Sequence, residues 1–245
     1  MTTVDKTSPI PAYFQIYQYI KNKISTNEWQ IGMQIPTERE LTELFGVSRM
    51  TVRHAFNILT QEGIVLREVG KGSFIAEPKI NQTLRKLTGF SEDMLAQGKK
   101  PSTKVLEAGY LEAEPFLAEK FKIPVGAKVF RLKRLRLADN KPMCLETVYL
   151  TEKNSQGLLD EDLSQSFYSL LREKIGIIPV RAKQQIQAGL STRDEANLLR
   201  IGVRDAVLRL TRYTFDKNNE QIEIVISAYR GDLYVFDVEL VALEG

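Results

Sequence analysis

The stretch from residue 37 to residue 75 constrains the fold of this chain more than any other. Thr37 followed three residues later by Glu40 is the pattern of a capping box, in which the hydroxyl accepts from a backbone amide and the carboxylate reaches back to the cap. A helix is therefore predicted to begin at Thr37 and to end at Gly46, because glycine readily adopts the left-handed conformation. Ser48 can cap a second helix directly afterwards. We expect two short helices joined by a tight turn.

The second of these helices has two contrasting faces. Its apolar residues fall at i, i+3, i+4 and i+7, which places them in one stripe facing a core. The stripe consists of Val52, Ala55, Phe56 and Leu59. At about 100° per residue, the opposite face carries cationic and hydrogen-bonding side chains. These are Arg49 at the helix start, Met50, Arg53, His54 and Asn57.

After Gly63, residues 64–69 and 73–76 are predicted to form two strands, joined by Gly70, Lys71 and Gly72. The glycines allow the positive φ of a tight hairpin. A helix that offers arginine, amide and imidazole groups, braced by another helix, fits the major groove of DNA, and the hairpin would lie on a neighbouring groove. An ordinary helical hairpin with a solvated face fits the same periodicities, so the pattern alone leaves both interpretations open.

Composition narrows the remaining classes. The 245 residues are 43% hydrophobic, which is ordinary for one large or two small globular domains. No apolar run approaches the roughly 20 residues that span a bilayer, and the start of the chain lacks a signal-peptide core, so we expect a cytoplasmic protein without membrane association. One cysteine, Cys144, and one histidine leave no disulfide, zinc site or Ser/His/Asp set. No cofactor, metal or catalytic residue is expected.

Strands and helices alternate through the rest of the chain. A further helix at 13–24 is expected to complete the amino-terminal core. Helices are also predicted at 114–122, 166–174 and 192–199, and strands at 103–111, 128–138, 143–150, 180–190, 207–215, up to 229, and 234–243.

Two parts of this region resemble one another. Val129, Arg131, Leu132 and Arg134 recur at the same spacing as Val207, Arg209, Leu210 and Arg212, and Glu146 returns as Glu223. We predict an internal repeat of strand, helix and hairpin, giving one antiparallel sheet with pseudo-twofold symmetry and a cleft between the halves. Chance similarity of strand composition is the alternative.

One strand of the repeat carries a candidate anion site. Arg134 and Arg136 alternate with Leu135 and Leu137, so both guanidinium groups lie on one face of the strand. Two convergent arginines can each fork onto a phosphate or a carboxylate. A solvated strand face is the other interpretation of this pattern.

The stretch from 37 to 75 resembles the winged helix-turn-helix of the GntR family of bacterial transcription regulators. The resemblance rests on residues 36–41, 45–53, 62–63 and 70–74. It implies that Arg39, Arg49 and Arg53 contact phosphates and base edges and that Gly70 enters the minor groove, while His54 stands where related sequences often have glutamine. The candidate DNA-binding residues are Thr37, Arg39, Ser48, Arg49, Thr51, Arg53, His54, Arg67, Gly70 and Lys71.

Residues 85–242 resemble the UTRA ligand-binding domain of the HutC subgroup of that family, a fold similar to chorismate lyase. The resemblance rests on residues 87–94, 134–138, 166–168, 181–184 and 229–232. It implies an α+β chain with an amino-terminal winged helix-turn-helix and a carboxy-terminal antiparallel-sheet α/β ligand-binding domain. The predicted boundaries are 8–78 for the DNA-binding domain, 79–90 for a linker and 91–243 for the effector-binding domain.

Within this subgroup the chain most resembles the repressors of amino-sugar utilisation, which sense an amino-sugar phosphate. That resemblance implies that Arg134, Arg136, Ser166 and Tyr168, with the turn before Ser91, hold a phosphate. It also implies that other residues face the sugar, namely Glu146 and Tyr229. The candidate effector-binding residues are Phe90, Ser91, Arg134, Arg136, Glu146, Ser166, Tyr168, Arg181 and Tyr229.

The expected function is that of a homodimeric repressor on a palindromic double-stranded DNA operator. Twofold partners are expected because the half-sites of helix-turn-helix proteins lie about one helical turn apart. Release would follow binding of a sugar phosphate such as glucosamine 6-phosphate or N-acetylglucosamine 6-phosphate. One alternative keeps the regulator and makes the effector a carboxylate or another metabolite. A lyase-like enzyme is the remote alternative, because no general base, nucleophile or metal set is assembled in the sequence.

Overall fold

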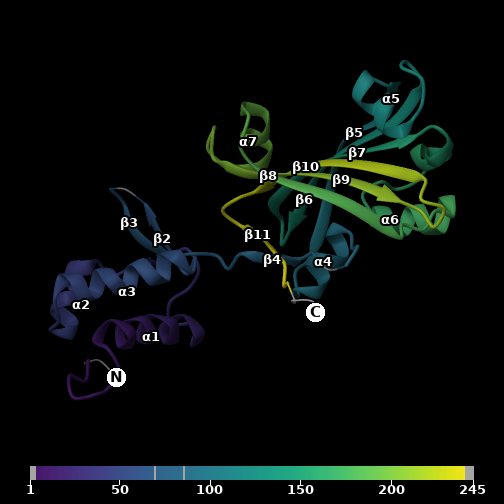
Figure 1. Cartoon of the computed structure of the whole chain (residues 1–245). Coiled ribbons are helices and arrows are strands. Elements are labelled where there is room, and N and C mark those ends of the chain that lie inside the picture. Colours follow the sequence, from purple (N-terminus) through teal and green to yellow (C-terminus); the bar gives the residue numbers. More distant parts are fainter. Residues whose placement is uncertain (1–3, 69, 85, 241–245) are drawn as a thin grey trace. The chain divides into compact units, whose positions relative to one another are not determined.

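The computed structural model describes residues 4–68, 70–84 and 86–240. The chain divides into two compact units, Met1–Lys79 and Ile80–Gly245 (Figure 1). Both units combine helices with antiparallel sheet, as the predicted α+β class requires. Each unit is described by itself below.

The first unit consists of three helices and a three-stranded antiparallel sheet of order β1-β3-β2. Its elements are α1 (Ala12–Ser25), β1 (Gln34–Ile35), α2 (Glu38–Phe45), α3 (Arg49–Gln61), β2 (Val65–Glu68) and β3 (Gly72–Ile75).

The predicted helix signals of the first unit are present in the structure. The backbone N–H of Thr37 donates to Glu40 Oε2 at 2.7 Å, and the N–H of Glu40 donates to Thr37 Oγ1 at 3.3 Å, which completes the capping box. Gly46 ends α2 in the left-handed conformation, with φ of 60°. Ser48 caps α3 by accepting from the N–H of Thr51. These local bonds fix the turn between α2 and α3.

The apolar stripe of α3 forms the centre of the first core. Its four residues are buried among side chains of α1 and α2. The core includes Ile16, Ile20, Leu41, Phe45, Val52, Ala55, Phe56 and Leu59. Because this stripe is buried, the opposite side of α3 remains available for a partner.

The predicted hairpin is formed by β2 and β3, and Val69, which was assigned to its first strand, lies outside the described residues. The sequence did not reveal β1, whose two residues pair with Phe74 and Ser73 and are too few to show a period. Gly72 has a φ of 120°, and a Cβ there would lie 2.6 Å from Gln34 Nε2. Glycine is therefore required where the hairpin crosses β1.

The second unit is built on a six-stranded antiparallel sheet of order β5-β6-β7-β10-β9-β8, with a separate two-stranded sheet. Its strands are β4 (Ile80–Thr83), β5 (Pro101–Glu112), β6 (Lys128–Ala138), β7 (Lys141–Thr151), β8 (Arg181–Leu190), β9 (Ala206–Phe215), β10 (Gln221–Arg230) and β11 (Tyr234–Asp237). Its helices are α4 (Phe90–Ala96), α5 (Pro115–Phe121), η1 (Lys153–Ser155), η2 (Leu158–Asp160), α6 (Phe167–Leu170), η3 (Leu171–Ile175) and α7 (Arg193–Leu199).

The strand order has the pseudo-twofold arrangement that the repeat predicts. β5, α5, β6 and β7 form one half, β8, α7, β9 and β10 form the other, and the halves meet where β7 pairs with β10. The predicted equivalence of Glu146 and Glu223 is wrong, because Glu223 lies one side chain further along the same face of its strand. Glu146 lies opposite Arg134, whereas Val225 lies opposite Arg212, so Val225 takes the equivalent position and Glu223 precedes it on the same face.

Helices cover both faces of the six-stranded sheet (Figure 1). α5 and α7 pack on the face that carries Leu135 and Ile224. α4 and α6 pack on the other face, against Leu132 and Leu210. Arg134 and Arg136 alternate with their leucine neighbours as predicted and point to the side of α4 and α6.

Three segments differ from the sequence predictions. The segment predicted as a linker contains β4, which pairs in parallel with β11, a partner so distant in the chain that no local pattern could reveal it. The helix predicted at 166–174 is a single α-helical turn, α6, continued by the wider π-helical turn η3. The strand predicted at 234–243 is shorter in the structure, where β11 ends at Asp237. Residues 241–243 lie outside the described residues.

Replacing Phe56 with alanine is expected to destabilise the first unit alone. Phe56 is fully buried in the α1–α3 core, so the change removes about 3–5 kcal/mol from the unfolding free energy of that unit. Leu132→Ala, in the core of the second unit, is the reciprocal control. Denaturant unfolding with probes in each unit checks this: two transitions should shift separately, and a single transition that both variants shift equally would contradict the two-unit description.

Candidate functional site

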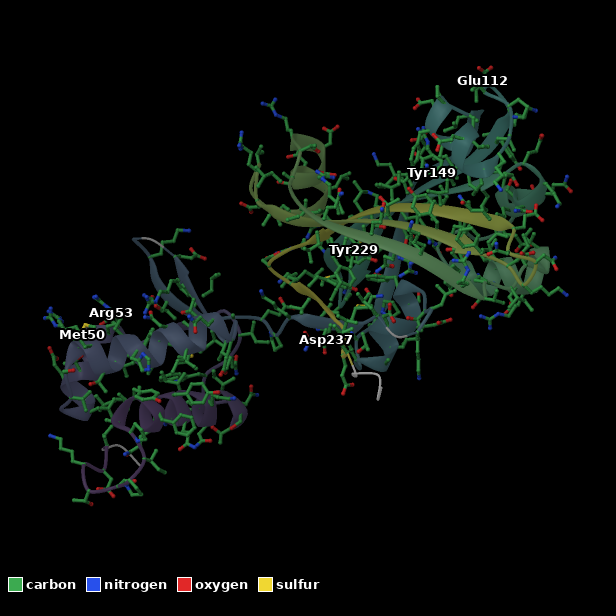
Figure 2. The ribbon with its side chains drawn as sticks, viewed as in Figure 1. Met50, Arg53, Glu112, Tyr149, Tyr229 and Asp237 are labelled. Carbon is green, nitrogen blue, oxygen red and sulfur yellow. The ribbon has the colours of Figure 1, made fainter. Side chains whose placement is uncertain are left out.

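The exposed side of α3 carries the first group of candidate residues. Arg49, Met50 and Arg53 are exposed, and Met50 retains 67% of its accessible surface. Figure 2 shows Met50 and Arg53 projecting from the side of α3 that faces away from α1. Two guanidinium groups and one flexible apolar side chain are therefore exposed at the amino-terminal half of a braced helix, which is where such helices read base edges.

Glu38, the first residue of α2, contacts side chains of both α3 and the hairpin. Its Oε2 lies 3.4 Å from Arg53 Nε, and its Oε1 accepts from Arg67 Nη2 at 2.8 Å. Arg67 also lies over the ring of Phe56, with Cζ 5.6 Å from the ring centre. One carboxylate thus orients an arginine of α3 and an arginine of β2 toward the same side of the unit.

The other candidate residues of the first unit lie in different surroundings. Arg39 is exposed and lies 3.8 Å from Glu43, and Lys71 pairs with Glu68 at the hairpin. His54 is also exposed, and its ring packs edge-on against Tyr13 of α1, with the ring centres 4.3 Å apart. It therefore lies at the border of the exposed face, next to α1.

The second group of candidates surrounds a pocket between the six-stranded sheet and helices α4 and α6. All candidate effector-binding residues except Arg181 line it, and Figure 2 shows Tyr229 on β10. The polar and charged lining residues are Gln82, Thr88, Ser91, Arg134, Arg136, Glu146, Ser166, Tyr168, Arg212, Glu223, Ser227 and Tyr229.

A buried charge cluster forms one side of the pocket. Glu146 Oε1 accepts from Arg134 Nε at 3.0 Å and Nη2 at 2.5 Å and lies 3.6 Å from Arg136 Nη1. The side chains of both arginines are only 2% exposed. Although burial alone would raise it, the pKa of Glu146 lies below its ordinary value because of the two guanidinium groups. The cluster therefore carries two positive charges and one negative charge.

Helices α4 and α6 hold the two arginines of this cluster. Arg136 donates from Nη2 to Ser91 Oγ at 2.9 Å and lies over the ring of Phe90. Arg134 lies over the ring of Phe167, next to the candidate residue Ser166. Each guanidinium group thus packs against an aromatic ring, and Arg134 Nη1 also donates to the carbonyls of Leu163 and Gln165.

Sequence reasoning did not assign Arg212 and Glu223, which form the other side of the pocket. Tyr168 and Thr214 both donate hydroxyl hydrogen bonds to Glu223 Oε2, at 3.2 and 2.8 Å. Arg212 donates to the carbonyl of Thr88 and to Tyr168. The repeat contained the signal, because it matches Arg212 with Arg134. Burial raises the pKa of Glu223 to about 7, against the hydrogen bonds and Arg212.

Several polar atoms of the lining have no hydrogen-bond partner among the described residues. They include Arg136 Nε, Ser227 Oγ and Gln82 Oε1. Buried polar atoms are normally paired, so unpaired atoms around a cavity indicate a ligand or bound water. The cavity measures about 30 Å³, which is enough for one or two water molecules.

Arg181 and Cys144 do not line this pocket. Arg181 is exposed at the start of β8, where it donates to Asn219 and stacks on Phe215, so the structure does not bring it to the pocket. Cys144 is buried, and burial raises its thiol pKa, which fits a packing residue as predicted. The described residues contain no group of three or more histidine, cysteine or acidic side chains that could hold a metal.

Comparison with known proteins agrees with this geometry. Residues 12–75 match the family "Bacterial regulatory proteins, gntR family", and residues 96–235 match the UTRA domain. None of the described helices has the length and apolar character needed to cross a membrane.

Similar proteins span nearly the whole chain. The HTH-type transcriptional repressor NagR of Bacillus subtilis (strain 168) is 36% identical over 95% of this chain and 96% of its own. The HTH-type transcriptional regulator GgaR of Escherichia coli (strain K12) is 30% identical over 94% of this chain and 91% of its own. The crystal structure of PhnF from Mycobacterium smegmatis superposes with a TM-score of 0.70 at 31% identity, covering 93% of this chain and 100% of PhnF.

NagR and GgaR are named as transcription regulators, and the resemblance drawn from the sequence is confirmed. The chain is a DNA-binding regulator of transcription and not an enzyme. It belongs to the GntR family of bacterial regulatory proteins, among the members that combine the amino-terminal helix-turn-helix with a carboxy-terminal UTRA domain.

Proposed function

We propose that this regulator is a homodimeric repressor that leaves its operator when a sugar phosphate, of the amino-sugar 6-phosphate class, fills the pocket of the second unit. The observation that carries the proposal is the buried cluster of Arg134 and Arg136 around Glu146, with Ser91 and Ser166 beside it. A buried cationic pair with hydroxyl donors is built for an anion, and phosphate accepts more hydrogen bonds than a carboxylate.

The charge of the pocket supports a dianion. Its charged lining residues are three arginines and two glutamates, of which Glu223 has a pKa of about 7. At neutral pH the lining therefore carries a net charge between +1 and +2. A phosphate monoester carries about −1.5 to −2 at that pH, whereas a simple carboxylate carries −1. A carboxylate effector remains the alternative, and the charge balance favours the phosphate.

Glu146 pairs with both Arg134 and Arg136, and the cavity beside them, about 30 Å³, is far too small for a sugar. A sugar phosphate therefore binds a more open arrangement, in which phosphate oxygens take the place of the Glu146 carboxylate and Glu146 is free to accept from sugar hydroxyls. Induction requires only that this arrangement bind the effector more tightly than the DNA-competent one.

Two further features support the homodimeric repressor. The relative NagR is described as a transcriptional repressor and matches almost the entire chain. Helix-turn-helix proteins bind half-sites about one helical turn apart on one face of DNA, which calls for two copies related by a twofold axis. The operator is accordingly expected to be palindromic.

The proposal is tested by titrating the full-length protein with ligands in a calorimeter and following operator release in parallel. The ligands are glucosamine 6-phosphate, N-acetylglucosamine 6-phosphate and the two unphosphorylated sugars, and the operator is selected from random duplexes with the same protein. Binding of only phosphorylated forms, with operator release, is expected. If carboxylates release the operator and no phosphorylated sugar binds, the proposed effector class is wrong.

Two single substitutions are expected to separate the two activities. Arg53→Ala removes an exposed guanidinium of α3 and should weaken operator binding about 10- to 100-fold while leaving effector binding intact. Arg134→Ala removes half of the anion site and should weaken sugar-phosphate binding at least about 30-fold while leaving operator binding intact. Gel shifts and calorimetry measure both. Exposed Arg172→Ala is the matched control, and joint loss of both activities in either variant would contradict the assignment.

The pKa of Glu223 predicts how stability depends on pH. A carboxyl whose pKa is raised to about 7 in the folded state opposes folding once it must ionise, so the penalty grows as pH rises from about 4.5 to 7 and is constant above. Glu223→Gln removes it and should stabilise the protein by roughly 2 kcal/mol more at pH 8 than at pH 5. Denaturant unfolding at both values checks this. Equal effects at the two pH values would show that Glu223 titrates normally.

A further inference from the structure

Gln82 connects the pocket to the first strand of the second unit. It lies on β4, is 5% exposed and lines the pocket. Its Nε2 donates to Asp93 Oδ2 at 2.6 Å, and its Oε1 has no partner among the described residues. Buried polar atoms are normally paired, so this oxygen calls for a partner beyond the described residues, such as a ligand or a bound water.

The orientation of the amide follows from its neighbours. Asp93 lies in the first turn of α4 and also accepts from Thr88 Oγ1 at 2.6 Å. Because a carboxylate can only accept, the NH₂ group of Gln82 must face Asp93. Its carbonyl oxygen therefore lies on the side away from Asp93, in a residue that lines the cavity.

The chemistry of this oxygen defines what can meet it. An amide carbonyl only accepts hydrogen bonds, so its partner is a hydroxyl or an N–H group. A phosphate oxygen without a proton is excluded. Gln82 therefore suits the end of the effector that carries hydroxyl and amino or amide groups, while Arg134 and Arg136 suit its phosphate end.

The position of Gln82 in the chain gives this contact a further role. β4 begins at Ile80, directly after Lys79, the last residue of the first unit. In the described part of the chain β4 pairs only with β11, through four residues. Because so few backbone hydrogen bonds hold this strand, one added hydrogen bond changes the stability of its pairing with β11.

We propose that Gln82 accepts a hydrogen bond from a hydroxyl or N–H group of the effector and that this bond couples occupancy of the pocket to β4, and so to the segment that leads to the DNA-binding unit. The inference rests on the proposed function, because it assigns one end of the sugar phosphate. The coupling is a difference in effector affinity between two positions of β4. Gln82 is a coupling residue as well as a ligand contact.

The decisive variant is Gln82→Lys. Its ammonium group can still donate to Asp93 but offers no acceptor to the effector. Gln97→Lys is the matched control, because Gln97 is exposed at the end of α4, donates only to the backbone of Asp93 and lies outside the pocket lining. Both variants add the same charge. Thermal unfolding verifies that each is folded, and Gln82→Leu replaces the lysine variant in the same assay if the latter is not.

The readout is operator release at equal occupancy, with N-acetylglucosamine 6-phosphate and glucosamine 6-phosphate as probes. Calorimetry gives the occupancy, and fluorescence anisotropy of a labelled operator gives the release. Wild type and Gln97→Lys should release the operator in step with occupancy, whereas Gln82→Lys should release at least fivefold less at the same occupancy. Release in step with occupancy in the Gln82 variant overturns the inference and leaves the proposed function standing. Absence of binding by wild type would instead overturn the proposed function, and the inference with it.

Discussion

The architecture of the second unit depends on placing two guanidinium groups and one carboxylate out of water. Buried charges are tolerated only when their partners are held in good geometry, and removing one partner of such a pair is far more destabilising than never burying it. The register of β6 and β7 meets this requirement by setting Arg134 directly opposite Glu146. Phe90 and Phe167 close the cluster from the helices. Replacing a buried ion pair with apolar residues of similar volume is often neutral or stabilising, so folding alone does not call for this cluster, and its presence supports the proposed anion site.

The pseudo-twofold sheet gives this cluster an unequal counterpart. Each half contributes an arginine at the equivalent position, Arg134 and Arg212, but the glutamates occupy different positions. Glu146 is held ionised by two arginines, whereas Glu223 meets mainly neutral hydroxyl groups and has a pKa of about 7. The excess positive charge of the pocket comes from Arg136, a third arginine beside two glutamates. The raised pKa of Glu223 adds to it, because that carboxyl is only partly ionised at neutral pH.

Local signals explain how much of this could be predicted from the sequence. The capping box at Thr37, the stripe of α3 and the alternation of Arg134 with its leucine neighbours are short-range patterns, and the structure contains them. β4 could not be predicted, because its partner β11 is far away in the chain and a four-residue strand has no measurable period. Gln82 was missed for the same reason. Arg181 belongs to a string shared with the family, yet its strand carries it away from the pocket.

In the first unit, unlike the second, the ion pairs of the candidate site lie at the surface. Glu38 contacts Arg53 and Arg67 at the surface, where ion pairs contribute little to stability because water and salt screen them. Such a pair is useful for orientation: it restricts two long side chains that would otherwise sample many rotamers before meeting DNA. If Arg53 and Arg67 bind DNA as proposed, phosphates of the duplex compete with Glu38 for the same N–H groups. An ion pair that is weak enough to dissociate, but that still restricts the rotamers of its arginine, suits a regulator that must bind its operator and later release it.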